Sequence, residues 1–145
     1  MSTSDNAGIV TRLAALVIDA TLMALLVPVV ATGPVTLWTS LEGSAPGWLK
    51  TLSQLTAAVV PVVYFTMCWW GTGQTLGGLL FGTVVRRPDG AHVSLPRALA
   101  RAFFGLLIPL VWLIGMVTVL WDGQRRALHD RVFGTVVRRK LRPVH

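Results

Sequence analysis

The sequence predicts an all-α membrane protein with two transmembrane helices, a third apolar segment broken by proline, and a short two-stranded ribbon. Three observations lead to this prediction. Hydrophobic residues make up 53% of the 145 residues and charged residues only 13%, about half the usual charged share of a soluble domain. Two apolar blocks reach the roughly 20 residues that a helix needs to cross a bilayer. A heptapeptide also occurs twice. The length suits one domain over residues 1–145.

The first predicted transmembrane helix covers residues 13–33. Its only charged residue is Asp19, and Gly33-Pro34 is expected to end it because both residues interrupt helices. The preceding residues 1–10 lack the basic residues of a signal peptide. We therefore expect this block to be retained as a membrane helix.

The second predicted transmembrane helix covers residues 52–70 and contains no charged residue. It is separated from the first by residues 34–51, a predicted loop in which the charges of Glu42 and Lys50 cancel. A neutral loop followed by an uncharged span is typical of a hairpin whose turn lies on the non-cytoplasmic side.

The repeated heptapeptide FGTVVRR occurs at Phe81–Arg87 and again at Phe133–Arg139. Identity over seven residues indicates a duplicated structural unit or two strands that pair. The Thr-Val-Val core of each copy is β-branched and favours a strand. We expect the two copies to form a short cytoplasmic ribbon supported by the helix ends, because a two-stranded ribbon alone is marginally stable in water.

The third apolar segment, residues 98–121, is predicted to enter the membrane and return. Loop 71–101 carries four arginines and one acidic residue, and the tail 122–145 carries seven basic and two acidic residues. Basic segments stay on the cytoplasmic side, which conflicts with three full crossings. A re-entrant hairpin broken at Pro109 removes the conflict, and a continuous third span is the alternative. We expect the N-terminus, and with the hairpin the C-terminus, to face the cytoplasm of a bacterial inner membrane.

Arg12, Asp19 and Asp130 form the first candidate site, a charge clamp or an ion site. Arg12 and Asp19 are two helical turns apart and therefore share a helix face. A carboxylate within a bilayer costs about 3 kcal/mol, so Asp19 should face protein or water and find a cationic partner. Asp130 is a candidate partner for Arg12. The tail offers candidate partners for Asp19: Arg125, Arg126 and Arg131.

The second candidate site is a basic surface that would bind partner proteins or anionic lipid headgroups. Its residues come from both copies of the heptapeptide and from the tail: Arg86, Arg87, Arg125, Arg126, Arg131, Arg138 and Arg139. The net charge is +7, and the basic residues that produce it flank the apolar blocks. A cytoplasmic orientation of these residues explains the charge better than nucleic-acid binding does. We expect other membrane subunits and anionic lipids as partners, with a homo-oligomer as a further option.

We expect no catalytic residue, metal or cofactor. The single cysteine, Cys68, lies inside an apolar block, and the three histidines are not spaced as metal ligands. His129 beside Asp130 has no nucleophile motif to accompany it.

Three segments together resemble the RDD family of small bacterial membrane proteins. TRLAALVIDATLMALL is similar to its first helix, with Arg12 and Asp19 in the expected places. GQTLGGLLFGTVVRRPDG is similar to its central segment, and RRALHDRVFGTVVRR to its closing segment, with Asp130 as the candidate second aspartate. Gly78 departs from the family, where a basic residue is common, which puts a headgroup or partner contact at this position in doubt.

The resemblance implies two kinds of function. Some family members are associated with exchange of sodium or other cations for protons, and others are accessory domains of transport or secretion systems. We expect a non-enzymatic accessory or assembly subunit of a larger bacterial transport or respiratory complex, because 145 residues enclose little space for a transport path. The alternative is a cation/proton antiporter with Asp19 as its coupling carboxylate.

Overall fold

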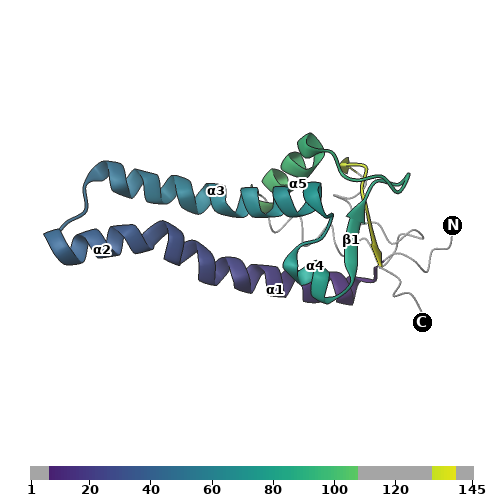
Figure 1. The fold of residues 1–145 in the computed structure, drawn as a ribbon, viewed down its shortest axis with the longest axis horizontal. Helices are drawn as coiled ribbons and strands as arrows, with labels where there is room; N and C mark the ends of the chain where they lie inside the picture. The colour runs from purple at the N-terminus through teal and green to yellow at the C-terminus, as the bar shows by residue number, and fades with distance from the viewer. Residues whose placement is uncertain (1–6, 108–131, 140–145) are drawn as a thin grey trace.

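The computed structural model describes residues 7–107 and 132–139. Two long antiparallel helical arms lie side by side, and the short elements gather at the end where the arms are open (Figure 1). We call this end, formed by α4, β1, β2 and the start of α5, the ribbon end. The architecture is mostly helical with one small antiparallel sheet, as the sequence predicts.

The first arm runs without a break from Ile9 to Glu42. It consists of α1 (Ile9–Val27), a π-helical turn η2 (Pro28–Thr32) and α2 (Gly33–Glu42). The predicted end at Gly33-Pro34 is therefore wrong. Pro34 has no N–H to donate within a regular helical turn. The wider π-helical turn η2, just before it, accommodates this loss, so the arm does not end here. The arm ends at Gly43, whose φ of 78° is the left-handed conformation of a helix C-cap.

The second arm is α3 (Gly47–Gly71), which contains the predicted span 52–70. Trp38 and Trp48 meet edge to face across the hairpin turn, with ring centroids 6.1 Å apart. The loop between the arms is short, in place of the predicted loop over residues 34–51.

Both arms are long and apolar enough to cross a membrane, and little of their surface is covered by protein. Only 17% of the apolar window of the first arm and 6% of that of α3 are buried. The core helix of a soluble protein buries its apolar face. Many large apolar side chains on these arms are instead exposed, among them Leu25, Val29, Leu55 and Val63.

The ribbon pairs β1 (Thr83–Arg86) with β2 (Val136–Arg139) in antiparallel register, which confirms the predicted pairing of the two heptapeptides. Val85 lies opposite Val137, and these are the same position of the two copies. Each strand follows a glycine with positive φ, 63° at Gly82 and 59° at Gly134. The repeat is therefore both a sequence duplication and a structural one, paired about its own centre.

The core lies at the ribbon end, where α4 (Leu76–Leu80) packs on α1 and α5 (Leu95–Leu107) packs on α3. The buried apolar cluster joins both arms, α5 and both strands: Ala7, Met23, Phe65, Trp69, Val85, Val93, Ala98, Ala102 and Val137. The described part of the third apolar segment is the helix up to Leu107. Residues 108–121, which decide between a hairpin and a span, lie outside the described residues.

Candidate functional site

The buried face of α1 carries the two charged residues that the sequence predicts to share a face. Arg12, Ala15, Asp19 and Met23 are its buried residues, at intervals of three and four. Asp19 is only 3% exposed. A carboxylate so completely removed from water needs hydrogen-bond donors.

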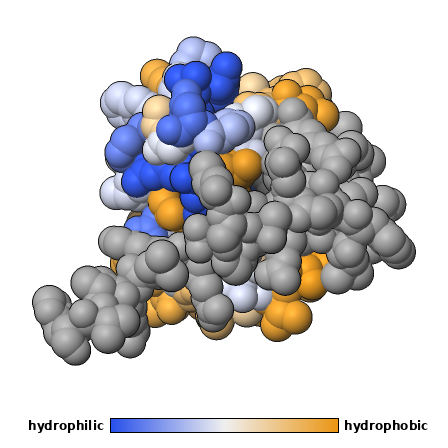
Figure 2. Space-filling model, turned by 90° about the vertical axis from the view of Figure 1, so that its right-hand side faces the viewer, coloured by the Kyte–Doolittle hydropathy of each residue, from blue (hydrophilic) through white to orange (hydrophobic). Residues whose placement is uncertain are grey.

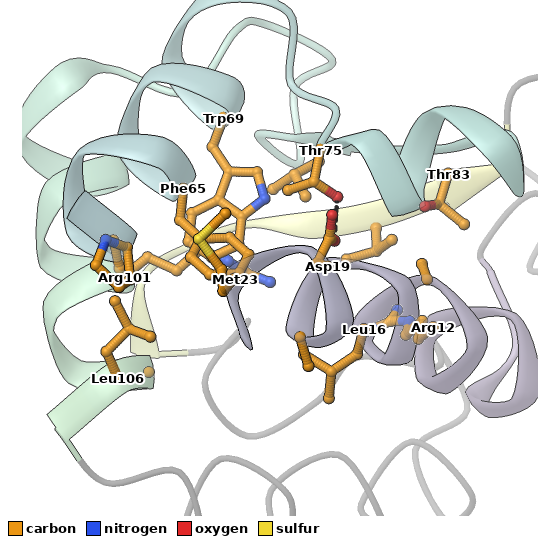
Figure 3. A pocket seen from close by; sticks show the side chains of 17 residues that line it. Arg12, Leu16, Asp19, Met23, Phe65, Trp69, Thr75, Thr83, Arg101 and Leu106 are labelled. Atoms are coloured by element: carbon orange, nitrogen blue, oxygen red, sulfur yellow. Dashed lines mark hydrogen bonds between the residues drawn. The ribbon is translucent and has the colours of Figure 1, made fainter. Parts of the chain in front are cut away.

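Three donors from outside α1 hold the Asp19 carboxylate. Oδ1 accepts hydrogen bonds from the hydroxyl of Tyr64 and from the backbone N–H of Gly77, both at 2.9 Å. Oδ2 accepts from the hydroxyl of Thr75 at 2.5 Å, a contact drawn in Figure 3. We call Asp19, Tyr64, Thr75 and Gly77 the Asp19 cluster.

The described residues do not provide the cationic partner that the sequence predicts for Asp19. Its three hydrogen-bond donors among them are all neutral. Hydrogen bonds to a charged acceptor are the stronger kind, and three of them satisfy a buried carboxylate without a salt bridge. The tail arginines that the sequence offered as partners, Arg125, Arg126 and Arg131, lie outside the described residues.

The two hydroxyl groups of the Asp19 cluster also bind the first turn of α4. Thr75 is the N-cap of α4, and its hydroxyl accepts from the N–H of Gly78 at 3.0 Å. The hydroxyl of Tyr64 accepts from the N–H of Leu76 at 3.1 Å. Each hydroxyl therefore accepts from α4 and donates to Asp19, which fixes the direction of the proton in each bond.

Gly77 allows α4 to lie directly against α1. A Cβ atom at this position would be 2.0 Å from the carbonyl oxygen of Ala15. The neighbouring Gly78 is also tightly enclosed, since a Cβ there would be 3.1 Å from the Thr83 hydroxyl. The space at Gly78 therefore leaves little room for a larger side chain.

The Asp19 cluster lies near the ribbon end of the hairpin rather than at its centre. Tyr64 is seven residues before the end of α3 at Gly71, a rise of roughly 10 Å. The loop after α3 then folds back beside α1 to bring Thr75 and Gly77 to Asp19. The carboxylate is thus held where the arms meet the ribbon.

Arg12, the second predicted member of the clamp, is 5% exposed. Its Nε donates to the carbonyl oxygen of Ala7 at 3.0 Å, and the N–H of Ala7 donates to the carbonyl of Val137 at 3.0 Å. Arg12 is therefore tied through the segment before α1 to strand β2. Its predicted partner Asp130 lies outside the described residues.

Arg101 is a buried cation that the sequence did not single out as a site residue. It is 3% exposed, its guanidinium carbon lies 4.8 Å from the ring centroid of Trp69, and it donates to the Thr135 hydroxyl at 2.6 Å. A cation over a tryptophan face is attracted by the ring quadrupole. The only sequence signal was its position at the start of an apolar block, one turn after Arg97.

The basic surface predicted from the heptapeptides lies on the ribbon. Residues alternate between the two faces of a strand, and Thr83 and Val85 are the buried ones in β1, so Arg86 points outward. Arg138 lies opposite Val84 and shares that outward face. Figure 2 shows hydrophilic residues gathered on one side of the ribbon end, beside apolar ones.

The arginines of this surface are held by loop 87–94. Arg86 lies 2.8 Å from Nδ1 of His92, Arg138 donates to the carbonyl of Pro88 at 3.0 Å, and Arg87 pairs with Asp89 at 2.9 Å. Arg139 is the last residue of β2, and its backbone lies opposite that of Thr83 in β1. The other predicted members, Arg125, Arg126 and Arg131, lie outside the described residues.

A cavity of about 430 Å³ lies between α1, α3 and α5, next to the Asp19 cluster. Figure 3 shows Met23, Phe65 and Trp69 among its apolar lining residues and Arg12, Asp19 and Arg101 among its polar ones. No pattern in the sequence predicts this cavity, because its walls come from three helices and two strands that are far apart in the chain.

Comparison with known proteins identifies the family. The family model described as "RDD family" matches residues 6–134, most of the chain, so the chain belongs to the RDD family. No curated protein and no solved structure matches. Family membership and the two exposed apolar arms together indicate a membrane protein.

Proposed function

We propose that this RDD-family chain is a non-enzymatic accessory or assembly subunit of a larger bacterial membrane complex for transport or respiration. The observation that carries the proposal is the saturation of Asp19 by Tyr64, Thr75 and Gly77. A coupling carboxylate must exchange its partners for an ion or proton in each cycle. A carboxylate that joins α4 to α1 has a different role: it stabilises the shape of a surface that a partner can bind.

The hydroxyl groups along the hairpin also support a role without ion transport. Ion pathways are lined by polar groups that face the route. Seven hydroxyls of the two arms instead donate to the carbonyl four residues earlier in their own helix, so these seven are directed along the backbone. The seven belong to Thr21, Thr32, Thr36, Thr39, Ser40, Thr51 and Thr56.

The outward basic face of the ribbon is the proposed contact surface for a partner subunit and for anionic lipid headgroups. Each arginine near an anionic leaflet adds about 1 kcal/mol of attraction. Arg86 and Arg138 are on the outward face, whereas the opposite end of the hairpin carries Glu42 and Lys50, whose charges cancel. By the positive-inside rule the ribbon end is cytoplasmic, in the inner membrane of a bacterium.

The ribbon also supports the re-entrant hairpin over a third span. Pro96 and Arg97, at the start of α5, line one groove together with Val132–Gly134. The chain therefore leaves the ribbon end at α5 and is back at that end by residue 132. An even number of crossings between these points keeps the C-terminus cytoplasmic. A C-terminal tag in spheroplasts should resist external protease, and its cleavage without lysis would contradict this topology.

Purification in mild detergent tests the accessory role directly. We expect the tagged chain to bring down a fixed set of other membrane subunits. The double variant Arg86→Gln/Arg138→Gln should lose most of them, whereas Lys50→Gln, at the other end of the hairpin, should retain them. Recovery of the wild type as a lone, discrete monomer would contradict the proposal, and so would equal recovery of partners by both variants.

The alternative function is cation/proton exchange with Asp19 as the coupling carboxylate, which the placement of buried Asp19 beside a cavity favours. It predicts cation flux coupled to a pH gradient in vesicles with the wild type, and loss of that flux in Asp19→Asn at normal expression. An accessory subunit shows no such flux when reconstituted alone.

A further inference from the structure

We propose that α4 lies inside the bilayer, at the acyl-chain boundary of the leaflet next to the ribbon, and that its leucines contact lipid. The short helix is thus a membrane-inserted part of the segment between α3 and β1, and the Asp19 cluster is what allows its backbone to be there. This inference rests on the two arms spanning the membrane, and it does not depend on the proposed accessory role.

α4 has one apolar face and one face of glycine. Leu76, Leu79 and Leu80 lie at spacings of three and four residues and therefore share a side of the helix. They are 50%, 59% and 71% exposed. Gly77 and Gly78 are the buried residues of α4, and Gly77 lies against α1. Neighbouring large apolar side chains that are left open in this way mark a contact with a membrane or another protein.

The depth of α4 follows from its contacts with the two arms. Gly77 lies against Ala15, which is roughly 6 Å nearer the ribbon end than Asp19 on the same helix. Trp70 is roughly 9 Å nearer that end than Tyr64, the residue of α3 that donates to Asp19. Tryptophan is enriched where a bilayer meets water, and Trp70 is exposed. α4 therefore begins on the bilayer side of this level, beside the first turns of α1 (Figure 1).

The apolar surface of α4 is continuous in depth with that of α1. Val10, Leu13 and Val17, in the same turns of α1, are exposed as well. They belong to the arm whose apolar surface is largely uncovered by protein. Lipid that surrounds α1 at this depth also surrounds the helix packed on it, so the occupant of the leucine face is the bilayer.

The start of α4 is paired as a lipid environment requires. The first N–H groups of a helix have no acceptor within it, and lipid provides none, so protein groups must accept these bonds. The N–H groups of Leu76, Gly77 and Gly78 all have such acceptors. In turn they are the Tyr64 hydroxyl at 3.1 Å, the Asp19 carboxylate at 2.9 Å and the Thr75 hydroxyl at 3.0 Å.

The other end of α4 is closed by its own backbone. The N–H groups of Phe81 and Gly82 donate to the carbonyls of Gly77 and Leu79, at 3.2 and 3.3 Å. At a protein surface in water, solvent can pair with such groups. Here the Asp19 cluster takes the role of that water, which gives the buried carboxylate a function that needs no ion.

Spin labels test the position of α4. In a Cys68→Ala background, Leu79→Cys and Leu80→Cys are labelled with a nitroxide, and the full chain is reconstituted in vesicles of phosphatidylcholine and phosphatidylglycerol. Power saturation then measures access to oxygen, which concentrates in lipid, and to a water-soluble nickel chelate. Leu25→Cys, exposed on α1, calibrates lipid, and Ala91→Cys, exposed in loop 87–94, calibrates water.

We expect both labels on α4 to have an oxygen-to-nickel access ratio several-fold above that of Ala91→Cys, approaching that of Leu25→Cys. A ratio equal to that of Ala91→Cys would place α4 in water. Exclusion of both reagents would mean that protein, such as a second copy of the chain, covers the leucines. Either of these two results would overturn the proposal.

A second measurement tests the role of the Asp19 cluster in keeping α4 in the bilayer. Thr75→Val, introduced into the protein labelled at Leu80, removes the acceptor of the Gly78 N–H and one donor to Asp19. We expect the access ratio at Leu80 to fall several-fold, toward that of Ala91→Cys, because the unpaired N–H draws the start of α4 toward water.

Thr56→Val is the matched control, since the Thr56 hydroxyl bonds only within α3, and it should leave the ratio at Leu80 unchanged. Circular dichroism verifies that both variants keep their helices. An unchanged ratio in a folded Thr75→Val, or an equal fall in both variants, would overturn the role assigned to the Asp19 cluster.

Discussion

The two ends of this protein are stabilised in different ways. In the shaft of the hairpin, which we define as residues 28–60, side-chain hydroxyls bond to their own helix, as Thr56 does to Leu52. At the ribbon end, hydrogen bonds join residues far apart in the chain, with separations of 45, 56 and 58 residues at Asp19 alone. The helices of the shaft need only an apolar solvent for their stability. The ribbon end is stable only when its residues reach particular hydrogen-bond partners elsewhere in the chain.

This difference has a physical origin. A helix satisfies its backbone internally, so in lipid it is stable with almost any apolar side chain. A turn, a short helix and two strands leave backbone groups that must be paired by the rest of the protein. We therefore expect mutational sensitivity to be concentrated at the ribbon end.

Asp19→Ala should have the largest effect, a loss of about 3 kcal/mol or more, because it leaves the donors of Tyr64, Thr75 and Gly77 without their acceptor. Thermal unfolding in mild detergent, followed by circular dichroism, measures it. Asp19→Asn should be intermediate, since the amide keeps one acceptor oxygen. A melting temperature unchanged in Asp19→Ala would mean that the cluster does not hold α4 to α1.

Gly77→Ala should cost about 2 kcal/mol, a typical value for forcing a methyl group into a filled space. The added Cβ meets the backbone carbonyl of Ala15, which no side-chain rotation can move. Gly71→Ala is the matched control, because a Cβ at Gly71 has nothing within 4 Å. Equal stability of the two variants in the same melting experiment would show that the close approach of α4 is dispensable.

Arg101→Met should cost about 1–2 kcal/mol through the loss of the cation over Trp69 and of a charged hydrogen bond to Thr135. Methionine keeps most of the apolar length of the side chain. Arg97→Met, one turn earlier on α5 and exposed, should be nearly neutral. Chemical denaturation of both variants in detergent would distinguish these outcomes. An unchanged free energy of unfolding in Arg101→Met would show that the contacts of Arg101 with Trp69 and Thr135 do not stabilise the fold.

Thr56→Val should change stability by less than about 0.5 kcal/mol, the usual limit for substitutions away from specific contacts. The hydroxyl of Thr56 bonds only to the carbonyl of Leu52, which the helix already satisfies. The same melting experiment serves as the measurement. A loss as large as that of Asp19→Ala would break the contrast between shaft and ribbon end.

The sequence alone determined the features that depend on composition and local pattern. Two long apolar blocks predicted the two arms, and the repeated β-branched heptapeptide predicted the ribbon. The same segments identified the RDD family. These predictions succeed because lipid acts on every apolar residue of a span, and because a repeat of β-branched residues marks the two segments that can pair as strands.

Which groups meet at the ribbon end depends on how the separate segments pack. Asp19 was visible as a buried charge, but its neutral partners come from α3 and from a loop that folds back, with separations that no helical period encodes. The same is true of Gly77 against Ala15 and of Arg101 under Trp69. Sequence patterns report the solvent around each segment, whereas these contacts depend on how separate segments pack together in three dimensions.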